Sequence, residues 1–207
     1  MSNPIIEVSG RARKDVDAES YRLAFEIEAE ADRPNDARAR ASDRQRTATD
    51  AIEAVSEAVT MDLRTGFVGE SASVFGCEAD AGFVARRTVE VRCPTEDVED
   101  VVAAGVQSGA LLEDLDPMLS GTTRDAVRGD LLAVATERAR EDAERTAAAA
   151  GHEVVGLESL ETRDPGPFDA LGAEDDIFDG DLEDAGVVEV GVAVDATYVI
   201  APTEADP

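Results

Sequence analysis

Residues 131–151 read LLAVATERAREDAERTAAAAG and form the most regular part of a helix predicted from Thr122 to Ala150. Thr122 and Asp125 resemble a capping box at its start, and Gly151 suits the position after its end. Because the apolar stripe is mostly alanine, whatever packs on it must come close. A sheet or a second copy of the same helix would both suit. The stripe repeats every four residues at Val127, Leu131, Ala135, Ala139, Ala143 and Ala147.

Two segments near the N-terminus alternate between apolar and polar residues, which is typical of half-buried strands. The first covers residues 5–14, and the second centres on residues 21–29. A polar connector of residues 15–19 separates them, so we expect the two strands to form a hairpin. The inward residues of the first strand are Ile6, Val8, Gly10 and Ala12, and those of the second are Tyr21, Leu23, Phe25, Ile27 and Ala29.

Pro34 begins a helix that we expect to run to about Val59, with apolar residues spaced by three, four or their sums. Its first half is rich in charge, which indicates either a solvated face with ion pairs or a contact with another subunit. The predicted inward residues are Ala37, Ala41, Ala48, Ile52, Val55 and Val59, and the charged residues are Arg38, Arg40, Asp43, Arg44 and Arg46.

The middle of the chain predicts strands over residues 66–77 and 83–93, joined by a turn near residues 79–82. Pro94 ends the second strand, and Thr95 is a candidate N-cap for a short helix that Gly109 ends. A strand follows over residues 111–120. The inward residues of the short helix are Val98, Val101, Val102 and Val106.

The last part predicts a strand over residues 154–163, an acidic loop over about 164–186 and a long closing strand over 188–200. The order β-β-α-β-β-α-β-α-β-β indicates an α+β fold, a mainly antiparallel sheet packed with three helices. We find no linker long enough to divide the chain, so we expect one domain over residues 1–207.

The 47 acidic and 19 basic residues give a net charge of −28. This charge argues against binding nucleic acid or anionic membrane surfaces, both of which attract clustered Lys and Arg. High net charge can prevent folding, but 43% of the residues are apolar and lie in periodic segments. The alternative, adaptation to molar salt, explains both the acidic surface and the single lysine, Lys14. We therefore expect a folded halophilic protein that is surrounded by nonspecific hydrated cations.

The first residues, MSNPIIE, contain neither a basic segment nor an apolar segment of the kind found in signal peptides. No apolar run approaches the length of about 18 residues that a membrane helix needs. These features predict a cytoplasmic protein. In the predicted hairpin, Cys77 faces a residue near Val84, far from Cys93, so we expect two free buried thiols rather than a disulfide.

A search for catalytic and metal-binding motifs predicts no catalytic, cofactor or metal residues. His152 is the only histidine, which excludes sites that need two imidazoles, and its place at a helix end suits an ordinary structural role. An EF-hand alignment of the acidic loop fails, since the third position is Ile177 and the twelfth is Gly186. Paired carboxylates can be neither identified nor dismissed among 47 acidic residues.

Four segments resemble motifs of the SIMPL-domain family, which includes YggE-like bacterial proteins and periplasmic immunogen-like proteins. Residues 6–12, IEVSGRA, resemble its opening I-x-V-x-G-x-G/A, and residues 62–65, DLRT, resemble its D-I-x-T. Residues 135–151 are similar to its long alanine-rich helix. Residues 194–200, VDATYVI, are similar to its closing V-x-V-x-Y-x-I/L. The resemblance covers about residues 5–201. We expect the chain to be a haloarchaeal-type cytoplasmic member of this family.

The resemblance implies an α+β fold, frequent homo-oligomerisation and a loosely defined link to oxidative stress or signalling. It implies no catalytic residues. The chain departs from the family's long helix, with Arg138 in place of Asp, Asp142 in place of Lys and Thr146 in place of Leu. We therefore expect a homo-oligomeric binding or scaffold module that is not an enzyme. The alternatives are a small-molecule-binding or enzymatic protein with a carboxylate-lined site, and redox protection through Cys77 and Cys93.

Overall fold

The computed structural model describes residues 4–64, 68–70, 82–163 and 186–203. Within these ranges, antiparallel strands pack with three α-helices, which confirms the predicted α+β class and order of elements. Two short strands, Thr60–Arg64 and Val68–Glu70, are found where we expected one strand over residues 66–77. Contacts group the chain into two compact units, residues 1–17 with 120–207 and residues 18–119. That residues 1–207 form one domain stays a prediction.

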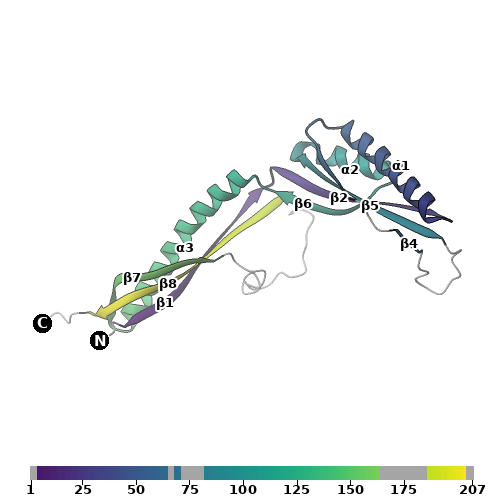
Figure 1. The fold of residues 1–207 in the computed structure, drawn as a ribbon. Helices are drawn as coiled ribbons and strands as arrows, with labels where there is room; N and C mark the ends of the chain where they lie inside the picture. The colour runs from purple at the N-terminus through teal and green to yellow at the C-terminus, as the bar shows by residue number, and fades with distance from the viewer. Residues whose placement is uncertain (1–3, 65–67, 71–81, 164–185, 204–207) are drawn as a thin grey trace. The chain divides into compact units, whose positions relative to one another are not determined.

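The first unit contains a three-stranded sheet in the order β1-β8-β7, with one long helix, α3, along one face (Figure 1). Its elements are β1 (Ile5–Asp17), α3 (Gly121–Ala149), β7 (His152–Arg163) and β8 (Val187–Pro202). The alanines of the α3 stripe are fully buried against the sheet. The stripe is therefore used inside one chain, and it is not available for a second copy.

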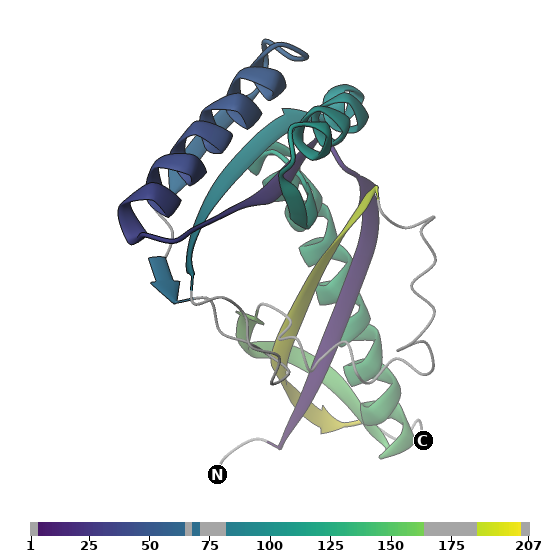
Figure 2. The same cartoon turned by 90° about the vertical axis from the view of Figure 1, so that its right-hand side faces the viewer.

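The predicted hairpin between the first two strands is wrong. β1 pairs along its whole length with β8, from Ile5 opposite Val199 to Asp17 opposite Val187 (Figure 2). The second strand, β2 (Ser20–Ala31), belongs to the other unit. A polar connector of a few residues is compatible with a hairpin but does not require one. The apolar faces of β1 and β8 pack together against the alanine stripe of α3. The local sequence pattern of β1 does not reveal this partner.

The second unit contains a five-stranded sheet in the order β3-β5-β2-β6, with β4 also paired to β5. Two helices, α1 and α2, cover one face of it (Figure 1). The strands are β2, β3 (Thr60–Arg64), β4 (Val68–Glu70), β5 (Phe83–Pro94) and β6 (Leu111–Met118), and the helices are α1 (Pro34–Glu53), η1 (Thr95–Asp97) and α2 (Val98–Gln107).

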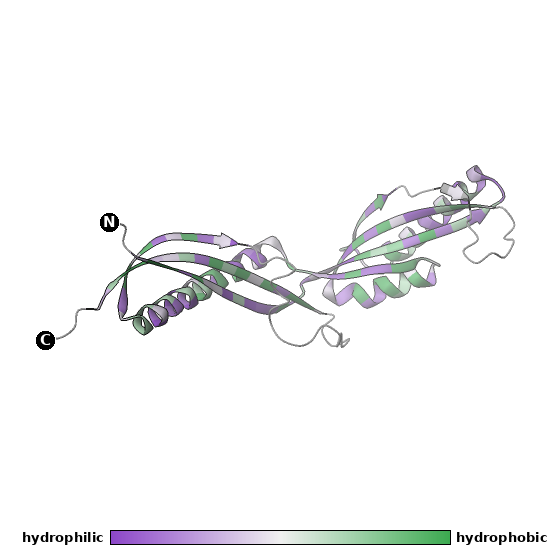
Figure 3. Ribbon diagram, turned by 90° about the horizontal axis from the view of Figure 1, so that it is seen from below, coloured by the Kyte–Doolittle hydropathy of each residue, from purple (hydrophilic) through white to green (hydrophobic). Residues whose placement is uncertain are grey.

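The core of this unit is built from the alternating apolar residues of β2 and β5. Leu23, Phe25 and Ile27 of β2 are at most 1% exposed, and Val89 and Val91 of β5 are completely buried. Cross-strand register places Leu23 opposite Val91 and Phe25 opposite Val89. Coloured by hydropathy, the long strands alternate between hydrophobic and hydrophilic residues (Figure 3), as expected for sheets with one covered face.

Several predicted helix details are corrected. α1 ends at Glu53, so Val55 is 43% exposed instead of inward, and Val59 packs against the core from the chain after the helix. In α2, Val106 is 51% exposed, because the helix presents Gly105 to the core directly against the ring of Phe25. Both errors arise because spacing alone does not show where a helix stops being covered.

Two predicted caps are also corrected. Thr95 does not cap α2: its hydroxyl donates to the carbonyl oxygen of Ala18 at 2.8 Å, and a 3₁₀ turn precedes the helix. The N-cap of α3 is Ser120, whose hydroxyl accepts from the amide of Thr123 at 3.2 Å, rather than Thr122. The predicted ends at Gly109 and Gly151 are confirmed, with φ of +88° and +72°.

The register around the predicted central hairpin is wrong. We expected a turn near residues 79–82, which would place Glu70 far along β5. Instead Glu70 lies opposite Phe83 at the start of β5. Residues 88–92, towards the end of β5, pair with β3. Cys77 lies outside the described residues, and Cys93 is a buried free thiol.

Candidate functional site

In the described part of the chain, each of the two sheets has one face that no helix covers, and polar side chains of neighbouring strands meet on both of these faces. No catalytic residue was predicted from the sequence, so these faces are the places where a site would be found. Among the described residues, no group of three or more His, Cys, Asp or Glu side chains is arranged to hold a metal ion.

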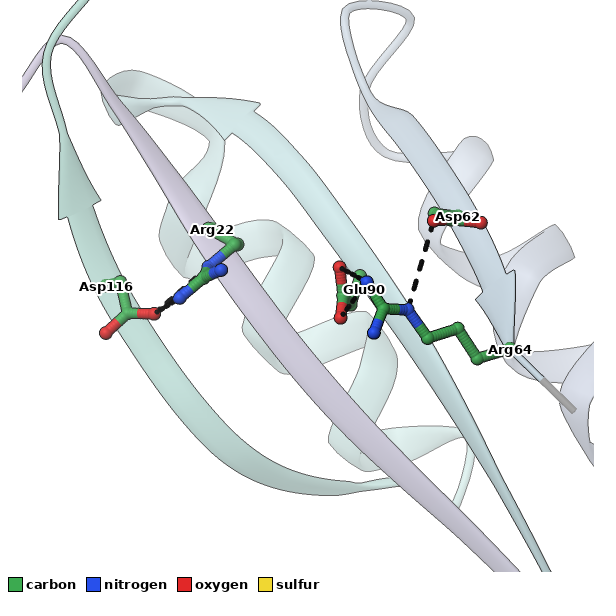
Figure 4. Close-up of polar contacts among 5 residues, drawn as sticks. All are labelled: Arg22, Asp62, Arg64, Glu90 and Asp116. Atoms are coloured by element: carbon green, nitrogen blue, oxygen red, sulfur yellow. Dashed lines mark hydrogen bonds and ion pairs between the residues drawn. The ribbon is translucent and has the colours of Figure 1, made fainter. Parts of the chain in front are cut away.

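The open face of the five-stranded sheet carries cross-strand ion pairs (Figure 4). Arg22 on β2 donates from Nε and Nη2 to Asp116 Oδ2 on β6, at 3.1 and 2.5 Å. This hydrogen bond, together with the charge of Asp116, raises the pKa of Arg22. Both side chains are about half exposed, at 49% and 47%. The pair therefore connects two strands at the surface and is not a desolvated catalytic pair.

The segment DLRT, which carries the second family motif, contributes to the same face. Asp62, Leu63 and Arg64 of this segment form the end of β3. Arg64 Nη2 lies 3.0 Å from Glu90 Oε1 on β5, and Arg64 Nε lies 4.0 Å from Asp62 Oδ2. Arg86 makes similar contacts with Glu28 and Glu26, at 3.1 and 3.7 Å. In these contacts each carboxylate is matched by a guanidinium on the same or a neighbouring strand, an arrangement that fixes strand register.

The open face of the three-stranded sheet contains a groove of about 440 Å³. Register explains its composition, because Glu7 lies opposite Thr197, Ser9 opposite Asp195, and both β8 residues lie opposite β7. Ser9 Oγ donates to Asp195 Oδ1 at 2.7 Å, and Arg163 Nε lies 3.7 Å from Asp195 Oδ2. The groove is lined by Glu7, Val8, Ser9, Ser159, Glu161, Asp195, Ala196 and Thr197.

This groove collects three carboxylates and three hydroxyls, none of which the sequence singled out. The alternation of β1 and β8 identifies their outward residues, but only the pairing of β1 with β8 brings those residues together. Four of the lining residues, Glu7, Ser9, Ser159 and Glu161, are exposed. Carboxylates that remain in water keep their hydration, so the groove offers little of the desolvation on which general acid–base catalysis depends.

The remaining candidate residues have structural surroundings. His152 Nδ1 lies 2.8 Å from the carbonyl oxygen of Ala150, near the end of α3, which agrees with the structural role expected for it. Cys93 is 2% exposed, and burial, with the charge of Asp97 second, raises the pKa of its thiol to about 11. The residues of the EF-hand alignment that precede Gly186, Ile177 among them, lie outside the described residues.

Among the described residues, one buried side-chain polar atom has no hydrogen-bond partner. Gln45 of α1 is 6% exposed, and its Oε1 accepts from Arg87 Nη1 at 2.8 Å, whereas its Nε2 makes no hydrogen bond. Arg87 lies on the helix-covered face of β5, opposite Ile27. The pair holds α1 to the sheet at a point where a charged residue interrupts the apolar face.

Three of the four family-like motifs meet in the first unit. Gly10 of β1 lies so close to α3 that a Cβ atom there would overlap the carbonyl oxygen of Ala135 and lie 2.9 Å from Ala139 N. Tyr198 and Ala196 of β8 pack against Ala139 and Ala143 in the same cluster. The motifs thus record a close helix–sheet contact rather than a set of reactive groups.

Comparison with known proteins agrees with the resemblance seen in the sequence. The family model described as "SIMPL: Protein of unknown function (DUF541)" matches residues 6–198, which is nearly the whole chain. A search of curated proteins finds no significant match. In the described part of the chain, no helix is both long and apolar enough to cross a membrane. With a match that spans both units and reaches into the last of the four motifs, the chain belongs to the SIMPL (DUF541) family.

Proposed function

We propose that this SIMPL protein is a non-enzymatic binding or scaffold module that acts as a homo-oligomer. The observation that carries the proposal is the exposure of large apolar side chains around the three-stranded sheet, in a chain with a net charge of −28. Contiguous exposed apolar patches mark contact sites, whereas apolar residues exposed singly are ordinary surface. Leu157 and Leu160 are near neighbours on the same face of β7. The exposed side chains are Ile5, Val134, Val155, Leu157 and Leu160, each between 41% and 54% exposed.

The alanine stripe of α3, which suggested oligomerisation from the sequence, no longer supports it. Ala135, Ala139, Ala143 and Ala147 are completely buried within one chain. The charged half of α1 also gives no support for an intersubunit contact. Arg40 and Arg44 donate instead to the carbonyl oxygens of Glu30 and Glu28 in the same chain, at 2.8 and 2.5 Å. The support that remains for self-association is the exposed apolar side chains of the first unit. The second unit exposes large apolar residues as well, at Val55, Leu63, Val106, Leu111 and Leu115.

The setting of this function is part of the proposal. A net charge of −28 and a single lysine favour a cytoplasm at high salt, without nucleic acid or membrane partners. The connection with stress response comes from the family resemblance alone and stays a prediction.

Light scattering of the full chain in concentrated KCl tests the proposal. We expect a mass of at least two chains at micromolar concentration. Dilution should shift the population towards single chains, as mass action requires. A single chain at every salt concentration, with the fold intact by circular dichroism, would contradict the proposal.

The groove on the three-stranded sheet supports a second candidate function, the binding of a small cationic molecule. Its carboxylates, Glu7, Glu161 and Asp195, would attract such a ligand. If this is correct, small amines should raise the melting temperature in low salt, and Asp195→Asn should remove most of that rise. An equal rise in the wild type and the variant would indicate only general screening of the acidic surface.

Redox protection through the cysteines receives no support from Cys93. A buried thiol with a raised pKa is a poor nucleophile and a poor sensor, since the thiolate is the reactive form. Thiol labelling of the native protein checks this, and we expect Cys93 to react only after unfolding. Fast labelling of Cys93 in the folded protein would restore the redox hypothesis.

A further inference from the structure

The three-stranded sheet has two open edges. In the described chain, β1 and β7 each pair with β8 and with no other strand. The amide of Ile200 donates to the carbonyl oxygen of Pro4, so the even-numbered residues of β1 direct their main-chain groups to β8 and the odd-numbered residues direct theirs outward. Of these outward groups, the carbonyl oxygen of Arg11 is covered by Arg138 Nη1 at 2.7 Å. Strand edges with free main-chain groups readily accept another strand.

The edge formed by β7 also exposes apolar side chains on the face that carries α3. Leu157 lies opposite Tyr198 and Leu160 opposite Ala196, so both leucines point to the helix side of the sheet. Tyr198 and Ala196 are 6% and 3% exposed, whereas Leu157 and Leu160 are 53% and 41% exposed. α3 therefore covers β1, β8 and the start of β7 at Val154, and leaves the part of β7 around Leu157 and Leu160 open.

At the opposite edge of the sheet, formed by β1, one side of α3 lies next to the outer strand. Arg138 reaches the outer edge of β1, and Val134 lies one turn earlier on the same flank of the helix. Val134 is 44% exposed. On the face that carries α3, the β7 edge therefore exposes Leu157 and Leu160. On the same face, the β1 edge is flanked by α3 with the exposed Val134.

We propose that the β7 edge of one copy joins the β1 edge of the next, so that the sheet continues from copy to copy with every α3 on the same face. The α3 flank of the second copy then covers Leu157 and Leu160 of the first. β1 and β7 are both antiparallel to β8, so the new strand pair is parallel. This inference rests on the self-association proposed above and identifies its surfaces. The contact is head-to-tail and leads to a ring or a filament.

Charge favours this contact over a symmetric pairing of β7 with β7, which a two-fold axis normal to the sheet would also allow. β7 carries the three glutamates Glu153, Glu158 and Glu161 against Arg163, so two copies of it repel. β1 is balanced, with three basic residues, Arg11, Arg13 and Lys14, and three acidic residues, Glu7, Asp15 and Asp17. The acidic strand therefore meets the less acidic edge.

Two variants test the two halves of the contact in the full chain. Leu157→Arg with Leu160→Arg places charge on the β7 face. Glu7→Pro removes an outward amide from β1 without removing a hydrogen bond to β8, a position where edge strands tolerate proline. Each variant alone should raise the dissociation constant by about tenfold or more, equivalent to about 1.4 kcal/mol. Leu111→Arg, at a leucine that is 63% exposed in the other unit, is the matched control and should assemble as the wild type does.

Mixing the variants distinguishes the two geometries. The leucine variant keeps an intact β1 edge and the proline variant keeps an intact β7 edge, so an equimolar mixture should form a one-to-one dimer by mass. In a symmetric β7–β7 contact, the proline variant alone would dimerise and the mixture would gain nothing. That result would overturn the inference.

Hydrogen exchange on the wild type needs no variant. The outward amides of Ile5, Glu7 and Ser9 should exchange more slowly in the assembled protein than after dilution to single chains. If the wild type never assembles, the proposed function fails and this inference falls with it. If the wild type assembles while both edge variants assemble equally well and these amides stay unprotected, only the inference is overturned.

Discussion

At the scale of single residues, Gly10 determines how closely α3 approaches the sheet. Its outward neighbours on β1 could be exchanged for other polar residues, but any Cβ at position 10 meets the main chain of α3 at Ala135 and Ala139. Main-chain atoms cannot rotate away as the end of a side chain can. The glycine is therefore required by packing rather than by its own backbone conformation, and it belongs to the first family-like motif.

Gly10→Ala should destabilise the protein strongly. We expect a loss of about 1–3 kcal/mol in the free energy of unfolding, since the overlap forces the helix away from β1. Gly129→Ala is the matched control, because Gly129 lies inside α3 with nothing within 4 Å of its absent Cβ. It should stabilise by about 0.5–1 kcal/mol through helix propensity. Denaturant unfolding in molar KCl measures both, and equal effects would contradict the close contact.

Cys93 predicts a loss of stability in alkaline solution. Its pKa is about 11 in the folded protein, against an ordinary value of 9.0 for a free thiol, so between these limits the unfolded chain releases a proton that the folded chain retains. The free energy of unfolding therefore falls as the pH rises from about 9 to about 11, and this contribution is fully present below pH 9. Cys93→Ala should show a shallower decline over the same range. Identical pH profiles for the wild type and the variant would show that the thiol is not buried as described.

At the scale of elements, arginines on helices donate hydrogen bonds to main-chain carbonyl oxygens of strands that no neighbouring strand of the described chain pairs. β6 pairs with β2 only as far as Glu26, and the carbonyl oxygens of Glu28 and Glu30 beyond it accept hydrogen bonds from Arg44 and Arg40. Arg138 does the same for β1. Arginine suits this role, because its long side chain carries several donors in a fixed plane. The arginines of α1 that looked like surface charge in the sequence thus bind α1 to its own sheet.

The start of α3 offers a direct comparison between two candidate caps. Ser120→Ala removes the hydroxyl that accepts from the amide of Thr123, and should cost about 1 kcal/mol of stability. Thr122→Ala, at the residue that the sequence pattern favoured, should change stability by no more than about 0.5 kcal/mol. Thermal unfolding of the two variants in the same buffer decides between them. A larger loss for Thr122→Ala would restore the sequence-based cap.

At the scale of the whole molecule, the acidic surface governs stability. Although Arg22, Arg64 and Arg86 neutralise carboxylates on the open face of the five-stranded sheet, the chain keeps a net charge of −28. The repulsion among these charges is screened within about 3 Å at 1 M salt and over about 30 Å at 0.01 M. Stability should therefore depend strongly on salt.

We expect the melting temperature to rise steeply between dilute buffer and molar KCl. Circular dichroism at several salt concentrations measures this rise, and the effect should begin well below the concentrations at which salts strengthen apolar burial in general. A melting temperature that stays flat over this range would contradict the halophilic interpretation.

The sequence by itself determined the properties that depend on local periodicity and on composition. Alternation located β1, β2, β5 and β8, four-residue spacing located α3 and its buried alanines, and the motifs indicated the family. Tertiary structure decided which strands pair, because the period of two defines the faces of a strand but not its neighbour. The pairing of β1 with β8 rather than β2, the groove around Asp195 and the open β7 edge all follow from that choice. The same pairing converted the alanine stripe from a possible interface into the core of the first unit.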